Sequence, residues 1–211
     1  MIIGKVKRIL KYKYWGLFIF PFLLVFLAGR EANTRFSRDL SQFFPKESLS
    51  KKERVLYFLT EEEKNSNLSL REKKEFTHAV VRSGQRLQLP DGTKLGGHIP
   101  DSDLFLYVWA KTRSDLRSDS KSGHGILGLP EFQVANLEKK AGAKIDRVFD
   151  VFNFNLQFKI ALVLYKEYLS AGLSAKDAYL KLYGLGKAST EWERLEKIYA
   201  DLHEKVIPEN L

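Results

Sequence analysis

The stretch that decides the fold reads RSDLRSDSKSGHGILGL and spans residues 113–129. Its first part is rich in serine and charge, whereas its end places Gly125 and Gly128 three residues apart among aliphatic side chains. This composition predicts a polar loop followed by a tight apolar turn. An apolar run at 104–110 precedes the stretch and a helical pattern at 131–141 follows it. We therefore expect the loop and turn to follow a buried helix.

Helical periodicity covers most of the chain around this stretch. Apolar residues recur on one face from Leu68 onward, until the residues PDGTKLGG at 90–97 mark a turn. The expected helices are one that begins near residue 68, one capped by Asp101 or Ser102, and four at about 131–141, 145–170, 174–183 and 189–206. The segment 145–170 is the longest and most apolar, so we expect it to be the central buried helix. The predicted fold class is all-α.

The N-terminus combines a basic flank with an uncharged apolar segment, YWGLFIFPFLLVFLAG, at residues 14–29. As a helix this segment would span about 24 Å, somewhat less than the ~30 Å hydrocarbon core of a bilayer. A basic flank stays in the cytoplasm. We therefore expect a single-pass anchor in a bacterial inner membrane, with the C-terminal domain in the periplasm. The alternative is a signal peptide that is cleaved after export to the periplasm, for which Leu27 and Gly29 make a poor cleavage site.

Three parts of the chain follow from these patterns. Residues 1–30 are the basic flank and transmembrane anchor, or the signal peptide. Residues 31–66 are interrupted and charge-balanced, and we interpret them as a stalk or linker with a short helix capped by Ser48 or Ser50. Residues 67–211 are expected to form the helical domain.

Charge and composition exclude several classes of function. The formal net charge is +9, but much of it comes from the basic residues before position 14. Because the remainder carries no dense Lys/Arg stripe with interleaved aromatic residues, we expect no nucleic-acid partner. The chain has no cysteine, and none of its four histidines lies at a metal-ligand spacing. We therefore expect no metal site and no cofactor.

The order of these features resembles the signature of lytic transglycosylases of the soluble-transglycosylase, goose-lysozyme-like kind. In that family a buried helix ends in Glu-Ser, and a loop then leads to Gly-Ala-x-Gly-Leu-Met-Gln. Here Arg113 and Ser114 stand at the Glu-Ser positions, and residues 125–129 match Gly-Ala-x-Gly-Leu. Pro130 and Glu131 replace Met-Gln.

The resemblance continues downstream and covers roughly residues 100–187. Asn155 and Leu156 lie where the family has Asn-Ile, and Tyr183 lies where it has the Tyr of Tyr-Asn-Ala-Gly. Lys159 and Leu162 depart from the family's glycine and tyrosine. The resemblance implies a lysozyme-like domain with a peptidoglycan-binding groove, in which the glycines let the backbone approach the glycan. The substrate-binding residues that it implies are Ser114, Gly125, Gly128, Glu131, Asn155 and Tyr183.

Arg113 changes what the resemblance implies for catalysis. The family's acid is a glutamate, and an arginine neither gives nor takes a proton at neutral pH. The first hypothesis is therefore an inactive, membrane-anchored protein that binds peptidoglycan or scaffolds a cell-envelope assembly. The second is an active lytic transglycosylase whose acid has moved to Glu131 or Asp115. The third is a helical protein-interaction module that binds no glycan.

A pairing between two of these residues is a further expectation. A guanidinium in a partly buried cleft needs a counter-charge, because an unpaired buried charge is costly. Glu131 is the acidic residue that the resemblance brings nearest to Arg113. We therefore expect Glu131 to neutralise Arg113 across the former active site; the alternative is that both side chains point to water.

Overall fold

The computed structural model describes residues 49–118, 123–144 and 153–206, which form seven helices without a strand. This confirms the predicted all-α class. The predicted anchor and the first part of the predicted linker lie in residues 1–48, outside the described ranges. Among the residues that are described, no helix has the length and apolar character needed to cross a bilayer.

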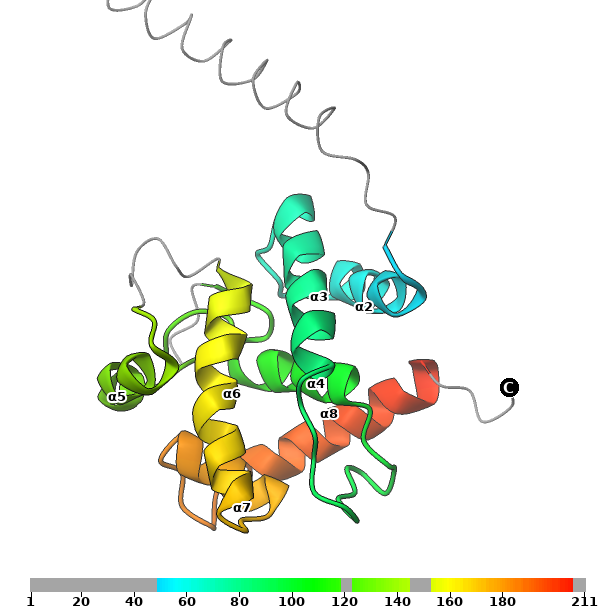
Figure 1. Ribbon diagram of the computed structural model, residues 1–211. Coiled ribbons are helices and arrows are strands. Elements are labelled where there is room, and N and C mark those ends of the chain that lie inside the picture. The colour runs from blue at the N-terminus through cyan, green and yellow to red at the C-terminus, as the bar shows by residue number, and fades with distance from the viewer. Residues whose placement is uncertain (1–48, 119–122, 145–152, 207–211) are drawn as a thin grey trace, which may run out of the picture. The chain divides into compact units, whose positions relative to one another are not determined.

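The helices lie close to their predicted positions (Figure 1). They are α2 (Lys51–Glu62), α3 (Leu70–Gly84), α4 (Ser102–Ser114), α5 (Glu131–Ala141), α6 (Phe154–Ser170), α7 (Ala175–Leu182) and α8 (Glu191–Val206). The segment 145–152, predicted as the first part of the longest helix, lies outside the described residues.

Side-chain caps explain where several helices begin. The hydroxyl groups of Ser50 and Ser69 each accept a hydrogen bond from the backbone N–H of the glutamate three residues later. The carboxylate of that glutamate accepts a hydrogen bond from the backbone N–H of the same serine, so α2 and α3 both start with a capping box. Asp101 caps α4 through the backbone N–H groups of Asp103 and Leu104. These local contacts satisfy backbone donors that have no partner inside the helix.

Helix α2 belongs to the same compact unit as the other helices. That unit begins at Leu49, whereas the sequence suggested a linker up to residue 66 and a domain from residue 67. Leu56 and Leu59 of α2 are buried, and the helix packs against α3. A short amphipathic helix gains stability chiefly by burying its apolar face, so it joins the domain instead of standing apart in a stalk.

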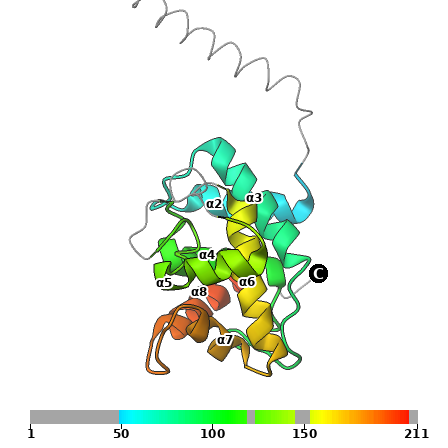
Figure 2. The ribbon, with the colours of Figure 1, turned by 60° about the vertical axis from the view of Figure 1, so that its left-hand side comes forward.

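The helix at the centre is α4 and not α6, which corrects the prediction for residues 145–170. Every residue from Asp103 to Ala110 is buried, and α4 packs between α3 and α8 (Figures 1 and 2). Helix α6 buries one face only, since Lys159 and Lys166 are exposed. Trp109 anchors the core, with its ring centroid 5.0–6.2 Å from the rings of four neighbours, Phe105, Tyr165, Tyr179 and Tyr183.

Candidate functional site

The C-terminal end of α4 carries the first two predicted site residues, Arg113 and Ser114. Helix α4 ends because Asp115 and Leu116 adopt left-handed backbone conformations, with φ of 52° and 57°. Left-handed conformations are costly for residues with a side chain. The chain therefore leaves α4 abruptly and directs the residues of its last turn toward the segment 123–129.

The segment 123–129 forms the predicted tight turn. His124 and Leu129 pair through two backbone hydrogen bonds of 2.9 and 3.0 Å. Gly125 and Gly128 have φ of 64° and 53°, which glycine adopts without strain. A Cβ on Gly125 would lie 2.3 Å from the side-chain oxygen of the buried Gln157. The close approach at Gly125 is therefore to a neighbouring helix, α6, whereas the resemblance implied an approach to bound glycan.

Ser114 and Tyr183 both hold this turn through its carbonyl groups. The buried Ser114 hydroxyl donates to the carbonyl of Ile126 at 2.7 Å. The Tyr183 hydroxyl donates to the carbonyl of Leu127 at 2.7 Å and accepts from the indole N–H of Trp109 at 2.6 Å. The structure thus brings Ser114, Tyr183 and the glycine turn together, and it uses both hydroxyls in internal contacts.

Arg113 is nearly buried and lies in a dense set of contacts. Its side chain is 9% exposed, and Nη1 lies 2.5 Å from Oε1 of Glu191, the first residue of α8. The guanidinium carbon lies 3.9 Å from the centre of the Tyr183 ring, and Nη2 donates to the carbonyl of Gly128 at 3.3 Å. The Tyr179 hydroxyl donates to the same oxygen of Glu191 at 2.6 Å. We call the set Arg113, Glu191, Tyr179 and Tyr183 the arginine cluster.

The surroundings of Arg113 keep it charged. Burial opposes the charged form, but the neighbouring Tyr183 and the carboxylate of Glu191 outweigh it, so the pKa of Arg113 is raised above its usual value. Burial also raises the pKa of Tyr183 and of Tyr179, so both phenols stay protonated at neutral pH. The cluster therefore presents a fixed cation, and its two hydroxyl groups are already hydrogen-bonded.

The two carboxylates proposed as relocated acids have other partners. Glu131, the first residue of α5, pairs with His124 and has a side chain 65% exposed. Asp115 lies 3.0 Å from Arg194 and is 46% exposed. The structure gives Glu191 as the carboxylate partner of Arg113, where the sequence suggested Glu131. The reason is that α8 crosses α4 and brings its first turn to the end of that helix.

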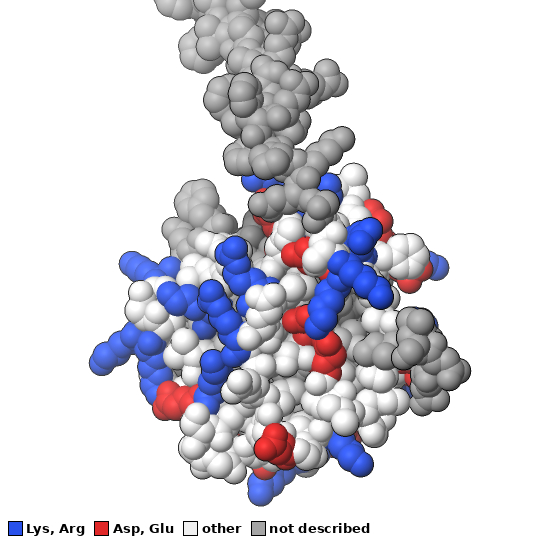
Figure 3. Space-filling model, turned by 45° about the vertical axis from the view of Figure 1, so that its right-hand side comes forward, with Lys and Arg blue, Asp and Glu red and all other residues white. Residues whose placement is uncertain are grey.

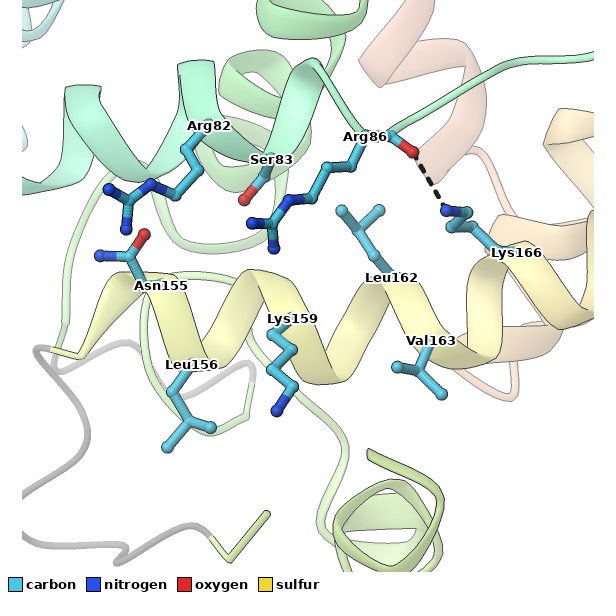
Figure 4. Close-up of a pocket in the computed structure, with 9 residues that line it drawn as sticks. All are labelled: Arg82, Ser83, Arg86, Asn155, Leu156, Lys159, Leu162, Val163 and Lys166. Atoms are coloured by element: carbon cyan, nitrogen blue, oxygen red, sulfur yellow. Dashed lines mark hydrogen bonds between the residues drawn. The ribbon is translucent and has the colours of Figure 1, made fainter. Parts of the chain in front are cut away.

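Asn155 lies apart from the arginine cluster. It is exposed on the first turn of α6 and lines a pocket between α3 and α6, beside Arg82 (Figure 4). The side chain that α6 contributes to the glycine turn is Gln157, which lies near the N–H of Leu127. Of the six predicted ligand-binding residues, the structure therefore separates Asn155 from Ser114, Gly125, Gly128 and Tyr183.

Sequence reasoning missed Glu191 and Tyr179. Glu191 belongs to an acidic group at the start of a helix, a pattern typical of a solvated face that also complements the helix dipole. Its contact with Arg113 joins residues 78 positions apart in the chain, and no local pattern predicts such a pair. The apolar spacing of α7 does place Tyr179 on its buried face.

The outer surface carries charges of both signs. On the face shown in Figure 3, Lys and Arg side chains gather in groups, with smaller acidic groups among them. Among the described residues, no three acidic or histidine side chains come together as a potential metal site. No family model, no curated protein and no solved structure matches this chain.

Proposed function

We propose that this chain is a membrane-anchored cell-envelope protein with a lysozyme-like, transglycosylase-like domain that binds peptidoglycan strands without cleaving them. The observation that carries the proposal is the arginine cluster. At the position of the family's catalytic glutamate stands a nearly buried cation that is paired with Glu191 and covered by the ring of Tyr183. Cleavage of a glycosidic bond requires a proton donor at the leaving oxygen, and Arg113 supplies none.

The contacts around Arg113 also argue against a neighbouring group that supplies the missing proton. The 2.5 Å ion pair, the ring contact and the carbonyl of Gly128 hold the side chain in one place. Glu191, the nearest carboxylate in these contacts, accepts from Arg113 and from Tyr179 through the same oxygen. A carboxylate oxygen that accepts two hydrogen bonds is poorly placed to donate a proton.

Co-sedimentation with purified sacculi tests the binding part of the proposal. The full chain in a nonionic detergent is mixed with insoluble peptidoglycan and centrifuged. We expect it to pellet with the sacculi, and the variant Glu131→Gln to weaken this retention, because the resemblance implies that Glu131 contacts the glycan. Lys197→Gln, an exposed change on α8, is the matched control.

If the chain stays in the supernatant, this result would contradict glycan binding and would favour the third hypothesis, a helical interaction module.

An active enzyme with a moved acid is the second candidate function, and Glu131 is the favoured acid because its side chain is exposed. If the chain releases 1,6-anhydro-muropeptides, the variants Glu131→Gln, Asp115→Asn and Glu191→Gln identify the acid. General-acid catalysis contributes about 10²–10⁴-fold to a rate, so removal of the true acid is readily measured.

A further inference from the structure

A pocket of about 320 Å³ lies between the C-terminal part of α3 and the outer face of α6 (Figure 4). Its lining combines four basic residues, two neutral polar residues and three aliphatic residues. The lining residues are Arg82, Ser83, Arg86, Asn155, Leu156, Lys159, Leu162, Val163 and Lys166. None of these described lining residues is acidic.

The basic side chains of this pocket have no carboxylate partner in the part of the chain that the structure describes. Among the residues that the structure describes, Arg82, Arg86, Lys159 and Lys166 form no ion pair with a carboxylate. Elsewhere on the surface, basic side chains such as Lys140 and Lys176 have acidic partners. Four unneutralised cations around one concave site create a positive potential that attracts anions.

Several hydrogen-bond donors of the pocket lie on the facing sides of α3 and α6. In Figure 4 the guanidinium groups of Arg82, on α3, and of Arg86, just after α3, extend toward α6, and the hydroxyl of Ser83 lies between them. The amide of Asn155 faces Arg82 from the first turn of α6. A guanidinium matches phosphate oxygens in a bidentate manner, and the start of a helix adds a partial positive charge.

One contact fixes the two walls of the pocket relative to each other. The amine of Lys166 on α6 donates to the backbone carbonyl of Arg86 at 3.0 Å. Helices α3 and α6 also pack along their lengths through the buried Phe76 and Phe158, whose ring centroids are 6.2 Å apart. The walls are therefore held in place before a ligand binds, which lowers the entropic cost of binding.

We propose that this pocket binds a phosphate group, held by the guanidinium groups of Arg82 and Arg86 and by the side chains of Ser83 and Asn155. A multiply charged phosphate satisfies several cations at once, which a single carboxylate does not. The phosphate belongs either to an anionic lipid headgroup or to a phosphate ester in solution. The aliphatic residues Leu156, Leu162 and Val163 would lie against the remainder of either molecule. The pocket is separate from the arginine cluster, so the proposal does not depend on glycan binding.

Isothermal titration calorimetry on the full chain, in a nonionic detergent, tests the proposal. The probes are inorganic phosphate, glycerol phosphate and a short-chain phosphatidylglycerol, with acetate at equal ionic strength as the carboxylate control. We expect saturable binding of the phosphate probes and weaker binding of acetate. Tighter binding of phosphatidylglycerol than of glycerol phosphate identifies the lipid headgroup as the source, and equal binding identifies a soluble ester.

The variant Arg82→Gln/Arg86→Gln should lower phosphate affinity at least about tenfold, because it removes the charge-assisted hydrogen bonds of both guanidinium groups. Arg82→Lys/Arg86→Lys keeps both positive charges but removes the bidentate guanidinium groups. Its phosphate affinity should lie between that of the Gln variant and that of the wild type. Lys197→Gln/Lys205→Gln, a change of equal charge at exposed positions of α8, should bind as the wild type does. Because Arg82 and Arg86 are exposed, circular dichroism should show that their variants fold. Absence of saturable binding, equal binding of acetate, or an equal loss in the α8 control would each overturn the proposal.

Discussion

The contacts of the Arg113 side chain determine what the end of α4 can do. Its guanidinium reaches the carboxylate of Glu191, the ring of Tyr183 and the carbonyl of Gly128, so the end of α4, the glycine turn and the start of α8 meet at one residue. A catalytic acid would need an open face toward substrate, whereas these contacts nearly bury the cation. At this scale the sequence identified the residue and its chemistry but not its partner.

The first prediction concerns the Arg113–Glu191 pair. Arg113→Gln should lower the free energy of unfolding by roughly 3 kcal/mol, because it leaves Glu191 without its charged partner in a mostly buried site. In a double-mutant cycle, Arg113→Gln with Glu191→Gln should cost less than the sum of the single changes. Urea denaturation measures all three values.

Arg194→Gln is the matched control, because it removes an arginine–carboxylate pair that is 53% and 46% exposed. It should cost less than about 1 kcal/mol. Additive effects at Arg113 and Glu191, or equal losses for Arg113 and Arg194, would show that the cluster does not act as a unit.

At the scale of elements, the caps and apolar patterns predicted helix positions well. Asp101 and Ser50 lie where a capped helix starts, and both were named from the sequence as candidate caps. The patterns did not predict which helix lies at the centre. A run of apolar residues predicts burial, but the exposed Lys159 and Lys166 leave one side of α6 open to solvent, whereas α4 is buried all round from Asp103 to Ala110.

The junction of α3 and α4 provides the second prediction. Inside a helix, replacement of glycine by alanine ordinarily stabilises the fold by about 0.5–1 kcal/mol, and Gly84 is the last residue of α3. At Gly84, however, a Cβ would lie 1.8 Å from Oδ1 of Asp103, whose other carboxylate oxygen, Oδ2, accepts from the amine of Lys52 at 2.9 Å. Overpacking of this kind costs about 1–3 kcal/mol, so Gly84→Ala should be net destabilising.

The measurement is the midpoint of thermal unfolding, with Gly186→Ala as the control. Gly186 is exposed, and a Cβ there meets no atom within 4 Å, so its substitution should change the midpoint little. A higher midpoint for Gly84→Ala than for the wild type would be incompatible with tight packing of α3 on α4.

The cap of α4 gives the third prediction, on pH. Burial raises the pKa of Asp101, but the backbone N–H of Leu104 and the amine of Lys52 outweigh it, so the net pKa lies below its ordinary value of 3.8. A carboxylate with a lowered folded-state pKa stabilises the fold above the unfolded pKa, and this stability is lost as pH falls through the folded value.

Asp101→Asn keeps the cap acceptor but removes the titration. Between about pH 5 and pH 2, the free energy of unfolding should therefore fall more steeply for the wild type than for Asp101→Asn. Burial raises the pKa of the neighbouring Asp103, and the charge of Asp101 adds to this rise, so the difference between the two curves reports the titration of Asp101 together with its coupling to Asp103. Parallel curves would rule out Asp101 as a source of acid sensitivity.

On the scale of the whole molecule, one core joins α2 through α8. Trp109 and its aromatic neighbours connect α4, α6 and α7, while Leu56 and Leu59 bring α2 into the same unit. The sequence predicted an all-helical domain because apolar periodicity is local. It did not predict that α2 joins the unit or that Glu191 meets Arg113, because both depend on contacts between distant segments.

Ile160 provides the fourth prediction. Its side chain is fully buried in α6, so Ile160→Ala should lower the free energy of unfolding by about 2–5 kcal/mol. Leu70→Ala is the control, because Leu70 is 64% exposed, and it should stay within about 0.5 kcal/mol of the wild type. Equal effects at the two positions would remove α6 from the core.

The central claim, a transglycosylase-like domain without cleavage activity, is tested most directly by mass spectrometry of the products that the full chain releases from purified sacculi. The resemblance aligns Arg113, which is not an acid, with the glutamate of the lytic transglycosylases, so we expect the supernatant to contain no 1,6-anhydro-muropeptides above the level of sacculi incubated alone. An authentic lytic transglycosylase, added to the same sacculi, should release them. Release of these products by the wild-type chain, growing with time and protein concentration, would contradict the claim.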